Sequence, residues 1–202
     1  MTVENRVQKI VILGGGTAGW MTAAAMARTL SRDVSITLLE SDDIGIVGVG
    51  EATIPTIHWF NDLIGLDEAE FVTATKASFK LGIEFVDWTR PGHRYFHPFG
   101  VYGVPAEGVP FHQRWLKASV EGGLDRPLAD FSLATQLAEQ NRFAKPASDP
   151  RSILSTLGYA WHFDASLYAG YLRSLCSPSR VTRVEGRLAE VERDPHTGRL
   201  TA

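Results

Sequence analysis

Residues 10–19 decide the fold class, and they read Ile10-Val11-Ile12-Leu13-Gly14-Gly15-Gly16-Thr17-Ala18-Gly19. The unbroken apolar run before the glycines is typical of a strand that is buried on both faces. Apolar residues recur at helical spacing from Trp20 to Leu30, and Val34 to Glu40 is a second apolar, β-branched run. The sequence therefore predicts a β-α-β unit with two parallel strands and a right-handed crossover, in an α/β protein.

The spacing Gly14-x-Gly16-x-x-Gly19 is that of a dinucleotide-binding turn. In such a turn the pyrophosphate binds at the helix N-terminus, where free N–H groups favour an anion. Glu40 follows Gly19 by 21 residues, at the end of the second strand, where an acidic side chain is expected to accept hydrogen bonds from the adenosine ribose. Glu40 argues against NADP, but the motif does not separate NAD from FAD. The alternative is a glycine turn without a nucleotide.

A second glycine cluster runs from Gly45 to Pro55 and overlaps a segment, Ser41 to Ala52, that we expect to be a loop. Its glycines allow the backbone to lie against a flat ligand such as an isoalloxazine ring, and the alternative is a flexible connector. Glu51 is expected either to cap the following helix or to contact a ligand.

The remaining elements are predicted from periodicity and turn residues. Asp67 and Asp164 are expected to be N-caps, because their side chains can accept hydrogen bonds from a first helical turn. We expect helices at 54–64, 67–76, 128–143 and 164–175, strands at 79–85, 181–184, 188–191 and 199–202, a long loop at 89–110, and a turn at 194–198.

Composition excludes several classes of protein. The chain has 202 residues, 44% of them hydrophobic, and a formal net charge of −3, so neither disorder nor nonspecific nucleic-acid binding is expected. Its one cysteine, Cys176, excludes an internal disulfide framework and a multi-cysteine zinc site. We expect no metal site, no membrane span and a cytoplasmic location.

Three segments resemble the flavin-dependent tryptophan halogenase family. They are Gly-Gly-Gly-Thr-Ala-Gly-Trp-Met at 14–21, Gly-Val-Gly-Glu-Ala-Thr-Ile-Pro at 48–55, and Phe79-Lys80 followed by Ile83, Phe85 and Trp88. Trp161-His162-Phe163-Asp164-Ala165 also looks like part of that family. The resemblance implies an FAD-binding Rossmann-like fold of the p-hydroxybenzoate-hydroxylase type. It further implies that a separate flavin reductase supplies reduced FAD, and that O₂ and halide yield hypohalous acid for an indole or tryptophan-type aromatic.

The resemblance also assigns residues. Lys80 matches the family's catalytic lysine, which presents the hypohalous acid. The alternative for Lys80 is an exposed strand lysine that pairs with Glu84. The implied contacts with FAD are Gly14, Gly15, Gly16, Thr17, Ala18, Gly19, Glu40, Ser41, Ile44, Val47 and Ala52, and Leu188 matches a position that touches adenine in this fold. For Leu188, a core leucine is the alternative.

The sequence also departs from the family. Its Trp-x-Trp-x-Ile-Pro signature and its second catalytic carboxylate are both absent, and family members are more than twice as long. We therefore expect residues 1–202 to be the N-terminal part of one FAD-dependent unit. In it, 1–55 carries the nucleotide-binding β-α-β and flavin loop, 56–160 an insertion with the catalytic lysine, and 161–202 the return to the FAD domain. A homodimer is an open expectation. The rival functions are an FAD-dependent aromatic hydroxylase and an FAD-binding fragment without catalysis.

Overall fold

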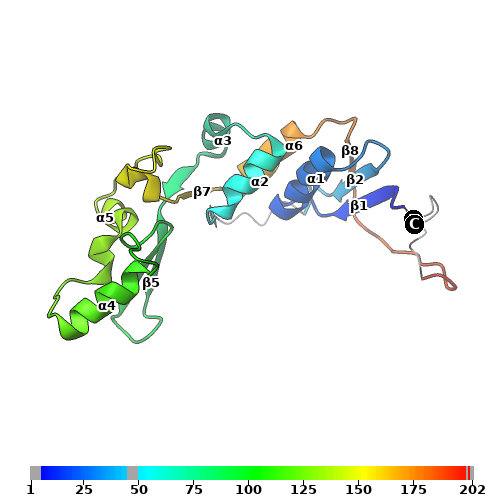
Figure 1. Cartoon of the computed structure of the whole chain (residues 1–202). Helices are drawn as coiled ribbons and strands as arrows, with labels where there is room; N and C mark the ends of the chain where they lie inside the picture. Colours follow the sequence, from blue (N-terminus) through cyan, green and yellow to red (C-terminus); the bar gives the residue numbers. More distant parts are fainter. Residues whose placement is uncertain (1–5, 45–49, 199, 201–202) are drawn as a thin grey trace. The chain divides into compact units, whose positions relative to one another are not determined.

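The structure is a computed structural model, and it describes residues 6–44, 50–198 and 200. It divides into two compact units (Figure 1). The first unit contains the described residues of Met1–Glu51, Phe60–Ala77 and Phe163–Ala202. The second unit contains Ala52–Trp59 and Ser78–His162. No helix among the described residues is long and apolar enough to cross a bilayer.

The first unit is built on a parallel three-stranded sheet. Its strands are β1 (Lys9–Leu13), β2 (Ser35–Glu40) and β8 (Val181–Glu185), in the order β1-β2-β8. Ile10 pairs with Ile36, and Ile36 pairs with Val181. Helix α1 (Thr17–Thr29) connects β1 to β2, so the predicted β-α-β unit with parallel strands is confirmed.

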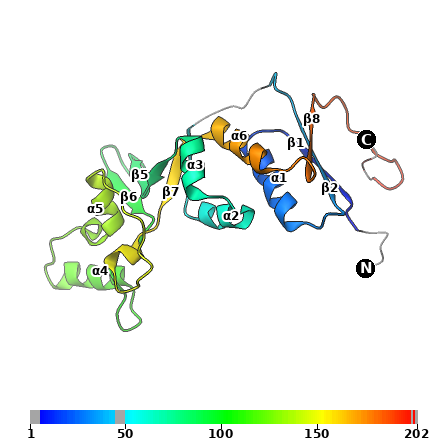
Figure 2. The ribbon, with the colours of Figure 1, turned by 90° about the horizontal axis from the view of Figure 1, so that it is seen from above.

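Helix α6 (Ala165–Leu175) packs against α1 on one side and against α3 (Glu68–Thr75) on the other, as Figure 2 shows from above. Trp20 of α1 and Tyr168 and Leu172 of α6 are buried, as are Ile36 and Leu38 of the sheet. The rings of Phe71, Phe163 and Tyr168 pack edge-to-face or tilted against each other at 4.6–5.5 Å. Burial of these apolar and aromatic groups is the main stabilising contribution in this unit.

The predicted N-caps of two helices are confirmed. The Asp67 side chain accepts a hydrogen bond from the Glu70 N–H and begins α3. The Asp164 side chain accepts from the N–H groups of Ser166 and Leu167 and begins α6. Each carboxylate satisfies N–H groups that the first helical turn leaves without an intrahelical acceptor.

The second unit contains a hairpin of β5 (Gly82–Val86) and β6 (Arg94–Pro98), and β4 (Ser78–Lys80), which pairs antiparallel with β7 (Ala160–Asp164). It also contains the helices α4 (Phe111–Glu121) and α5 (Leu133–Glu139), and 3-10 turns at Leu128–Phe131 and Ile153–Thr156. Its core is formed by Leu81, Ala134 and Leu157, with Phe96 and Tyr159 packed against them. β3 (Gly50–Ala52) lies on the other side of β7 from β4, and β3, β7 and α2 (Thr56–Ile64) each have residues in both units.

Several predicted elements were wrong. The single strand expected at 79–85 is two strands in different sheets, because the chain changes partner at Leu81. The loop expected at 89–110 contains β6, and the loop expected at 41–52 ends in β3. The helix expected at 128–143 is divided at Ser132, which caps α5 by accepting from the Thr135 N–H, and α4 was not predicted. Residues 188–191 are not a strand.

Two further expectations concern the ends of the sheet region. β1 is not buried on both faces: Val11 and Leu13 are 64% and 53% exposed, and β1 is the outer strand in the order β1-β2-β8. The turn at 194–198 is confirmed by the Gly198 N–H, which donates to the Asp194 carbonyl. Most of the strand expected at 199–202 lies outside the described residues, although Leu200 forms a bridge with Arg193.

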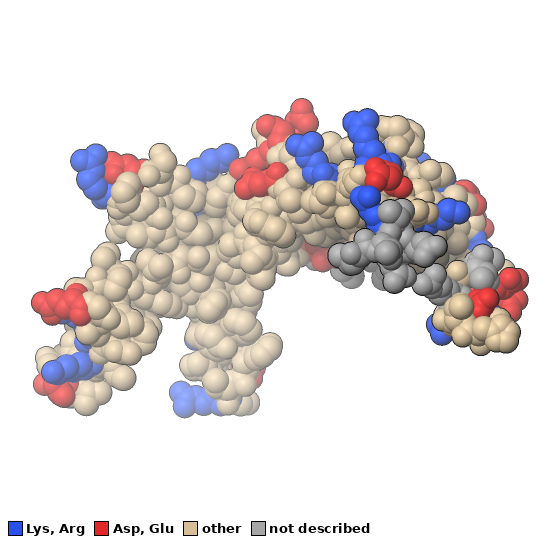
Figure 3. Space-filling view, turned by 45° about the vertical axis from the view of Figure 1, so that its right-hand side comes forward, with Lys and Arg blue, Asp and Glu red and all other residues tan. Residues whose placement is uncertain are grey.

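Charged side chains of both signs are intermingled on the face drawn in Figure 3. Several of them form exposed ion pairs, among them Arg94 with Glu84 and Arg151 with Asp149. Such exposed pairs contribute little to stability, since water and salt screen them.

Candidate functional site

Three glycines of the turn between β1 and α1, Gly14, Gly16 and Gly19, differ in their conformation and in the space around them. Gly14 has φ +104°, which favours glycine, and its N–H donates to the Leu39 carbonyl. A Cβ on Gly19 would collide with the carbonyl oxygen of Gly14, so glycine allows the helix to pack closely on the turn. A Cβ on Gly16 would have no protein atom within 4 Å. The turn is therefore closed toward the protein at Gly19 and open at Gly16.

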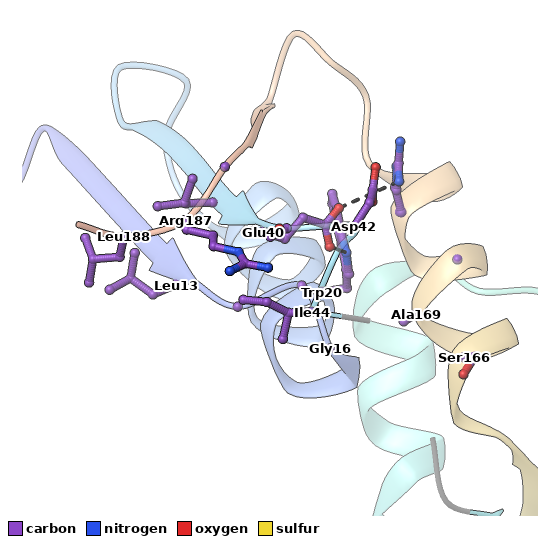
Figure 4. A pocket seen from close by; sticks show the side chains of 17 residues that line it. Leu13, Gly16, Trp20, Glu40, Asp42, Ile44, Ser166, Ala169, Arg187 and Leu188 are labelled. Carbon is purple, nitrogen blue, oxygen red and sulfur yellow. Dashed lines mark hydrogen bonds and ion pairs between the residues drawn. The ribbon is translucent and has the colours of Figure 1, made fainter. Parts of the chain in front are cut away.

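The open side of the turn faces a cleft of about 410 Å³ in the first unit (Figure 4). The end of β2, the face of α6 and the segment after β8 form its walls. In Figure 4, Leu13 and Leu188 lie at one end of the cleft, and Ser166 and Ala169 lie at the other. The full lining is Leu13, Gly14, Gly15, Gly16, Trp20, Leu39, Glu40, Ser41, Asp42, Ile44, Ser166, Ala169, Gly170, Arg173, Gly186, Arg187 and Leu188.

The N-terminus of α1 is ready to bind an anion. Its N-cap, Gly16, has no side chain to accept from the first-turn N–H groups, and no acidic residue lies in that turn. These N–H groups and the positive end of the helix dipole therefore favour a phosphate. The arginines Arg173 and Arg187 also line the cleft.

The Glu40 carboxylate is held by hydrogen bonds from two elements. One oxygen, Oε1, accepts from Arg183 Nε and lies 3.7 Å from an Arg173 nitrogen. The other, Oε2, accepts from the Trp20 indole N–H at 3.2 Å. A carboxylate oxygen can accept more than one hydrogen bond, so Glu40 can still bind a ribose hydroxyl. Gly15 lies so close to this carboxylate that a Cβ there would collide with it.

Most of the residues expected at a nucleotide site are brought together. The expected residues that line the cleft are Gly14, Gly15, Gly16, Glu40, Ser41, Ile44 and Leu188. Thr17, Ala18 and Gly19 lie in the first turn of α1 but are not part of the lining. Ala52 is not part of it either and belongs to the second unit, and Val47 lies outside the described residues.

Sequence reasoning missed the contribution of α6 and β8. Ser166, Gly170 and Arg173 present one face of α6 to the cleft, at spacings of four and three residues. The small residues Ser166 and Gly170 leave room for a ligand. Their spacing on a helix that the sequence did predict could have indicated this wall of the cleft. The Arg183 guanidinium hydrogen-bonds to Glu40 and to Asp42, and these bonds raise its pKa above the usual range.

Lys80 is buried in the second unit, at 8% exposure. Its Nζ donates to the Thr53 carbonyl at 3.0 Å and lies 5.3 Å from the centre of the Phe99 ring. Burial lowers the Lys80 pKa from its ordinary value, because it disfavours the charged form. The alternative of an exposed lysine paired with Glu84 was wrong, since Glu84 binds Arg94 through both carboxylate oxygens.

Lys80 also lines a second cleft, of about 370 Å³, whose other residues are Phe79, Leu81, Gly82, Phe96, Ala138, Asn141, Arg142, Phe143 and His162. The rings of Phe79 and Phe143 stack at 3.8 Å. Burial, and to a lesser degree the positive charge of Lys80, lower the His162 pKa. The wall of the cleft thus combines apolar and aromatic side chains with one amine, one imidazole, one guanidinium and one amide. No group of metal-binding side chains occurs among residues 6–44, 50–198 and 200.

Known proteins resemble this chain over nearly its whole length. Tryptophan 6-halogenase ThaL of Streptomyces albogriseolus is 34% identical over 99% of the chain and 40% of the relative, and tryptophan 7-halogenase RebH of Lentzea aerocolonigenes is 33% identical over 95% and 38%. The chain therefore spans about two fifths of the length of these curated relatives.

Solved structures give the same relationship. Xcc4156, a flavin-dependent halogenase from Xanthomonas campestris, superimposes with a TM-score of 0.87 at 44% identity, over 97% of this chain and 38% of that chain. BrvH, a flavin-dependent halogenase from Brevundimonas sp. BAL3, gives a TM-score of 0.85 at 43% identity, over 96% and 38%. These neighbours confirm the expected FAD-binding Rossmann-like class of fold. The family model for tryptophan halogenase matches residues 9–202, and with these relatives it shows that the chain belongs to the tryptophan halogenase family.

Proposed function

We propose that this chain supplies the FAD-binding cleft and the catalytic lysine of a flavin-dependent halogenase that acts on an indole or tryptophan-type aromatic. The observation that carries the proposal is the environment of Lys80: the residue is 8% exposed, and no carboxylate of the described residues pairs with its ammonium. A structural lysine at such a position is expected to pair with an acid, because burying an isolated charge is costly. Because the chain belongs to the tryptophan halogenase family, we assign this amine the role of the family's catalytic lysine.

The glycine turn fits FAD. Gly14 allows the tight bend, Gly16 leaves open space for a pyrophosphate, and Gly19 allows close packing of helix on turn. In this proposal Glu40 binds the ribose, Ser41, Ile44 and Leu188 line the adenosine side, and Arg173 contributes positive charge. Thr17, Ala18, Val47 and Ala52 stay in the proposed FAD-binding set on the strength of the resemblance alone.

The glycine turn and Glu40 would hold reduced FAD, which when bound would supply, together with O₂, the oxidising equivalents that convert a halide ion to hypohalous acid. Lys80 binds the hypohalous acid by donating a hydrogen bond from Nζ, which polarises the halogen toward the ring. The aromatic carbon then forms a bond to the halogen and loses its hydrogen as a proton, and the hypohalous oxygen leaves as water. A lowered pKa at Lys80 also increases the fraction of neutral amine, whose nitrogen can attack the halogen of hypohalous acid: a nitrogen–halogen bond forms, the oxygen–halogen bond breaks, and water leaves.

A separate flavin reductase is the proposed source of reduced FAD. The proposal also places the protein in the cytoplasm, which its single cysteine supports because free thiols are usual in a reducing compartment. Association of two copies is a further part of the proposal, and size-exclusion chromatography measures it.

The test replaces Lys80 by methionine, which keeps an unbranched stem of similar length and removes the ammonium. In the complete gene product, supplied with a reductase, FAD and bromide, we expect Lys80→Met to lose halogenation by a factor of at least about 10³ while FAD still binds. Lys117→Ala is the matched control, because Lys117 is an exposed lysine on α4.

Three results would contradict the proposal. Halogenation by Lys80→Met at the wild-type rate removes the lysine from the mechanism. Hydroxylated product that forms equally well without halide identifies an aromatic hydroxylase. Bound FAD without any turnover identifies a binding protein.

A further inference from the structure

Thr53 is bound to a single residue of β7 by three hydrogen bonds. Its N–H donates to the Trp161 carbonyl at 3.0 Å, and its hydroxyl donates to the same carbonyl at 2.9 Å. The hydroxyl also accepts from the Trp161 N–H at 3.0 Å. Trp161 is 1% exposed, so this support is in the interior of the second unit. The Thr53 hydroxyl thus uses both its donor and an acceptor position in one contact.

Lys80 depends on the same strand. β4 pairs with β7 so that Phe79 is opposite Trp161 and Lys80 is opposite Ala160. The two residues joined by the 3.0 Å bond from Lys80 Nζ to the Thr53 carbonyl are therefore both held by β7: Lys80 pairs with Ala160, and Thr53 is hydrogen-bonded to Trp161. The backbone of Lys80 is held by strand pairing, and the acceptor of its ammonium is held by the Thr53 hydroxyl.

A lysine side chain has four rotatable carbon–carbon bonds, and its ammonium has three equivalent donors. A fixed acceptor at one donor limits the rotation of the stem and sets the direction of the other two. The Phe99 ring, 5.3 Å from Nζ, limits the space on another side. The direction in which Lys80 donates to a small ligand is therefore determined by where the Thr53 carbonyl lies.

We propose that Thr53 is a positioning residue for Lys80: its hydroxyl, tied to Trp161, holds the backbone carbonyl that orients the Lys80 amine. This inference rests on the proposed function of Lys80. Thr53 itself contacts no reacting atom, and its effect is transmitted by the hydrogen bond to Nζ.

The kinetic test compares Thr53→Val, which keeps the shape and removes the hydroxyl, with Thr53→Ser, which keeps the hydroxyl and removes the methyl group. In the complete gene product we expect Thr53→Val to lower kcat by about tenfold or more, the effect of losing one well-placed hydrogen bond to a charged group. KM for the aromatic and Kd for FAD are expected to change by less than about twofold, and Thr53→Ser is expected to restore most of kcat.

Thr29→Val is the matched control, because the Thr29 hydroxyl donates only to the Ala25 carbonyl on the exposed side of α1. It should leave kcat unchanged. A purely structural role of Thr53 would alter folding and KM together with kcat, and the serine variant separates the hydroxyl from the methyl group.

A second readout does not require halogenation. An amine-acylating reagent at about pH 8, followed by peptide mass spectrometry, gives the reactivity of Lys80 relative to the exposed Lys76 in the same molecule. Without the hydroxyl, the Thr53 carbonyl is no longer held against Nζ, and a weaker bond to this acceptor favours the neutral amine, which reacts with the reagent. Thr53→Val should therefore raise the Lys80 labelling rate by about threefold or more, whereas Thr53→Ser should not.

The outcomes separate the two proposals. Unchanged Lys80 labelling in Thr53→Val, wild-type kcat in Thr53→Val, or a serine variant as impaired as the valine variant would each overturn the positioning role. If Thr53→Val fails to fold, wild-type kcat and labelling in Thr53→Ser support the role and a loss of either refutes it. Halogenation that survives Lys80→Met, together with hydroxyl-dependent labelling of Lys80, would refute the proposed function and leave the positioning contact in place.

Discussion

Gly16 and Gly19 belong to one motif but have opposite surroundings. A methyl group on Gly16 would meet no protein atom, whereas one on Gly19 would meet the Gly14 carbonyl oxygen. Gly16 also has φ −72°, which any residue adopts. The space at Gly16 is therefore available to a ligand, and the space at Gly19 is filled by the fold itself.

The two positions should respond differently to the same substitution. Gly16→Ala is expected to change the free energy of unfolding by less than about 0.5 kcal/mol and to weaken FAD binding by about tenfold or more. Gly19→Ala is expected to lower the free energy of unfolding by about 1–3 kcal/mol, because the backbone must shift. Urea denaturation and flavin fluorescence titration measure the two effects. Tight FAD binding by a folded Gly16→Ala protein would argue against a pyrophosphate at this turn.

The sequence predicted Glu40 at the cleft but not the groups that hold it. The interval between the glycine turn and Glu40 is short and has a known physical meaning, so it can be recognised without a structure. Arg183 follows Glu40 by 143 residues and reaches it only because β8 pairs with β2. Nothing local in the sequence indicates that pairing. The contact between Lys80 and the Thr53 carbonyl could not be predicted for the same reason, because it depends on how both segments pair with β7.

Among the elements, α6 joins the core of the first unit to the wall of the cleft. Ala165, Tyr168 and Leu172 are buried, while Ser166, Gly170 and Arg173 line the cleft. Its N-terminus is held by the Asp164 carboxylate, which accepts from two backbone N–H groups. The position of the cleft wall therefore depends on a cap at the last residue of β7.

Removal of that cap should destabilise the first unit. Asp164→Ala is expected to lower the free energy of unfolding by about 1 kcal/mol, since two N–H groups lose their acceptor. Asp164→Asn retains an acceptor oxygen and should cost only a few tenths of a kcal/mol. Urea denaturation followed by circular dichroism gives both values. Equal losses in the two variants would show that charge, rather than the hydrogen bonds, is responsible.

The strand expected at 79–85 shows why some elements were not predictable. Apolar and polar residues alternate with a period of two in any strand, so the pattern does not change where the chain leaves one sheet and enters another. The break at Leu81 arises from tertiary partners: Lys80 pairs with Ala160 of β7, and Gly82 pairs with Pro98 of β6. The helices at 56–64, 68–75 and 165–175 were predictable because their periodicity is local, and because Asp67 and Asp164 mark where the last two begin.

At the scale of the whole molecule, the two clefts belong to different units. The first cleft lies in the unit that carries the glycine turn, and the cleft at Lys80 lies in the second unit. A nucleotide that binds the glycine turn should therefore stabilise one unit directly.

Hydrogen–deuterium exchange with ADP tests this division. We expect ADP to slow amide exchange in the Gly14–Trp20 segment, because binding to the native state reduces local opening by mass action. Exchange in β5 and β6 is expected to be unchanged. Adenosine, which lacks the phosphates, is the matched ligand control and should protect the turn less. Equal protection in both units, or none at the turn, would contradict an adenine-dinucleotide cleft in the first unit.

The position of Trp20 has an optical consequence. Its indole is 3% exposed, lines the cleft and donates to Glu40, whereas Trp59 and Trp88 are 70% and 74% exposed. A buried indole emits at shorter wavelength than a hydrated one, and a flavin absorbs in that emission range. Excitation energy absorbed by Trp20 will therefore pass to a flavin in the cleft, so the Trp20 share of the blue emission, to which the buried Trp161 also contributes, reports cofactor loading without any label.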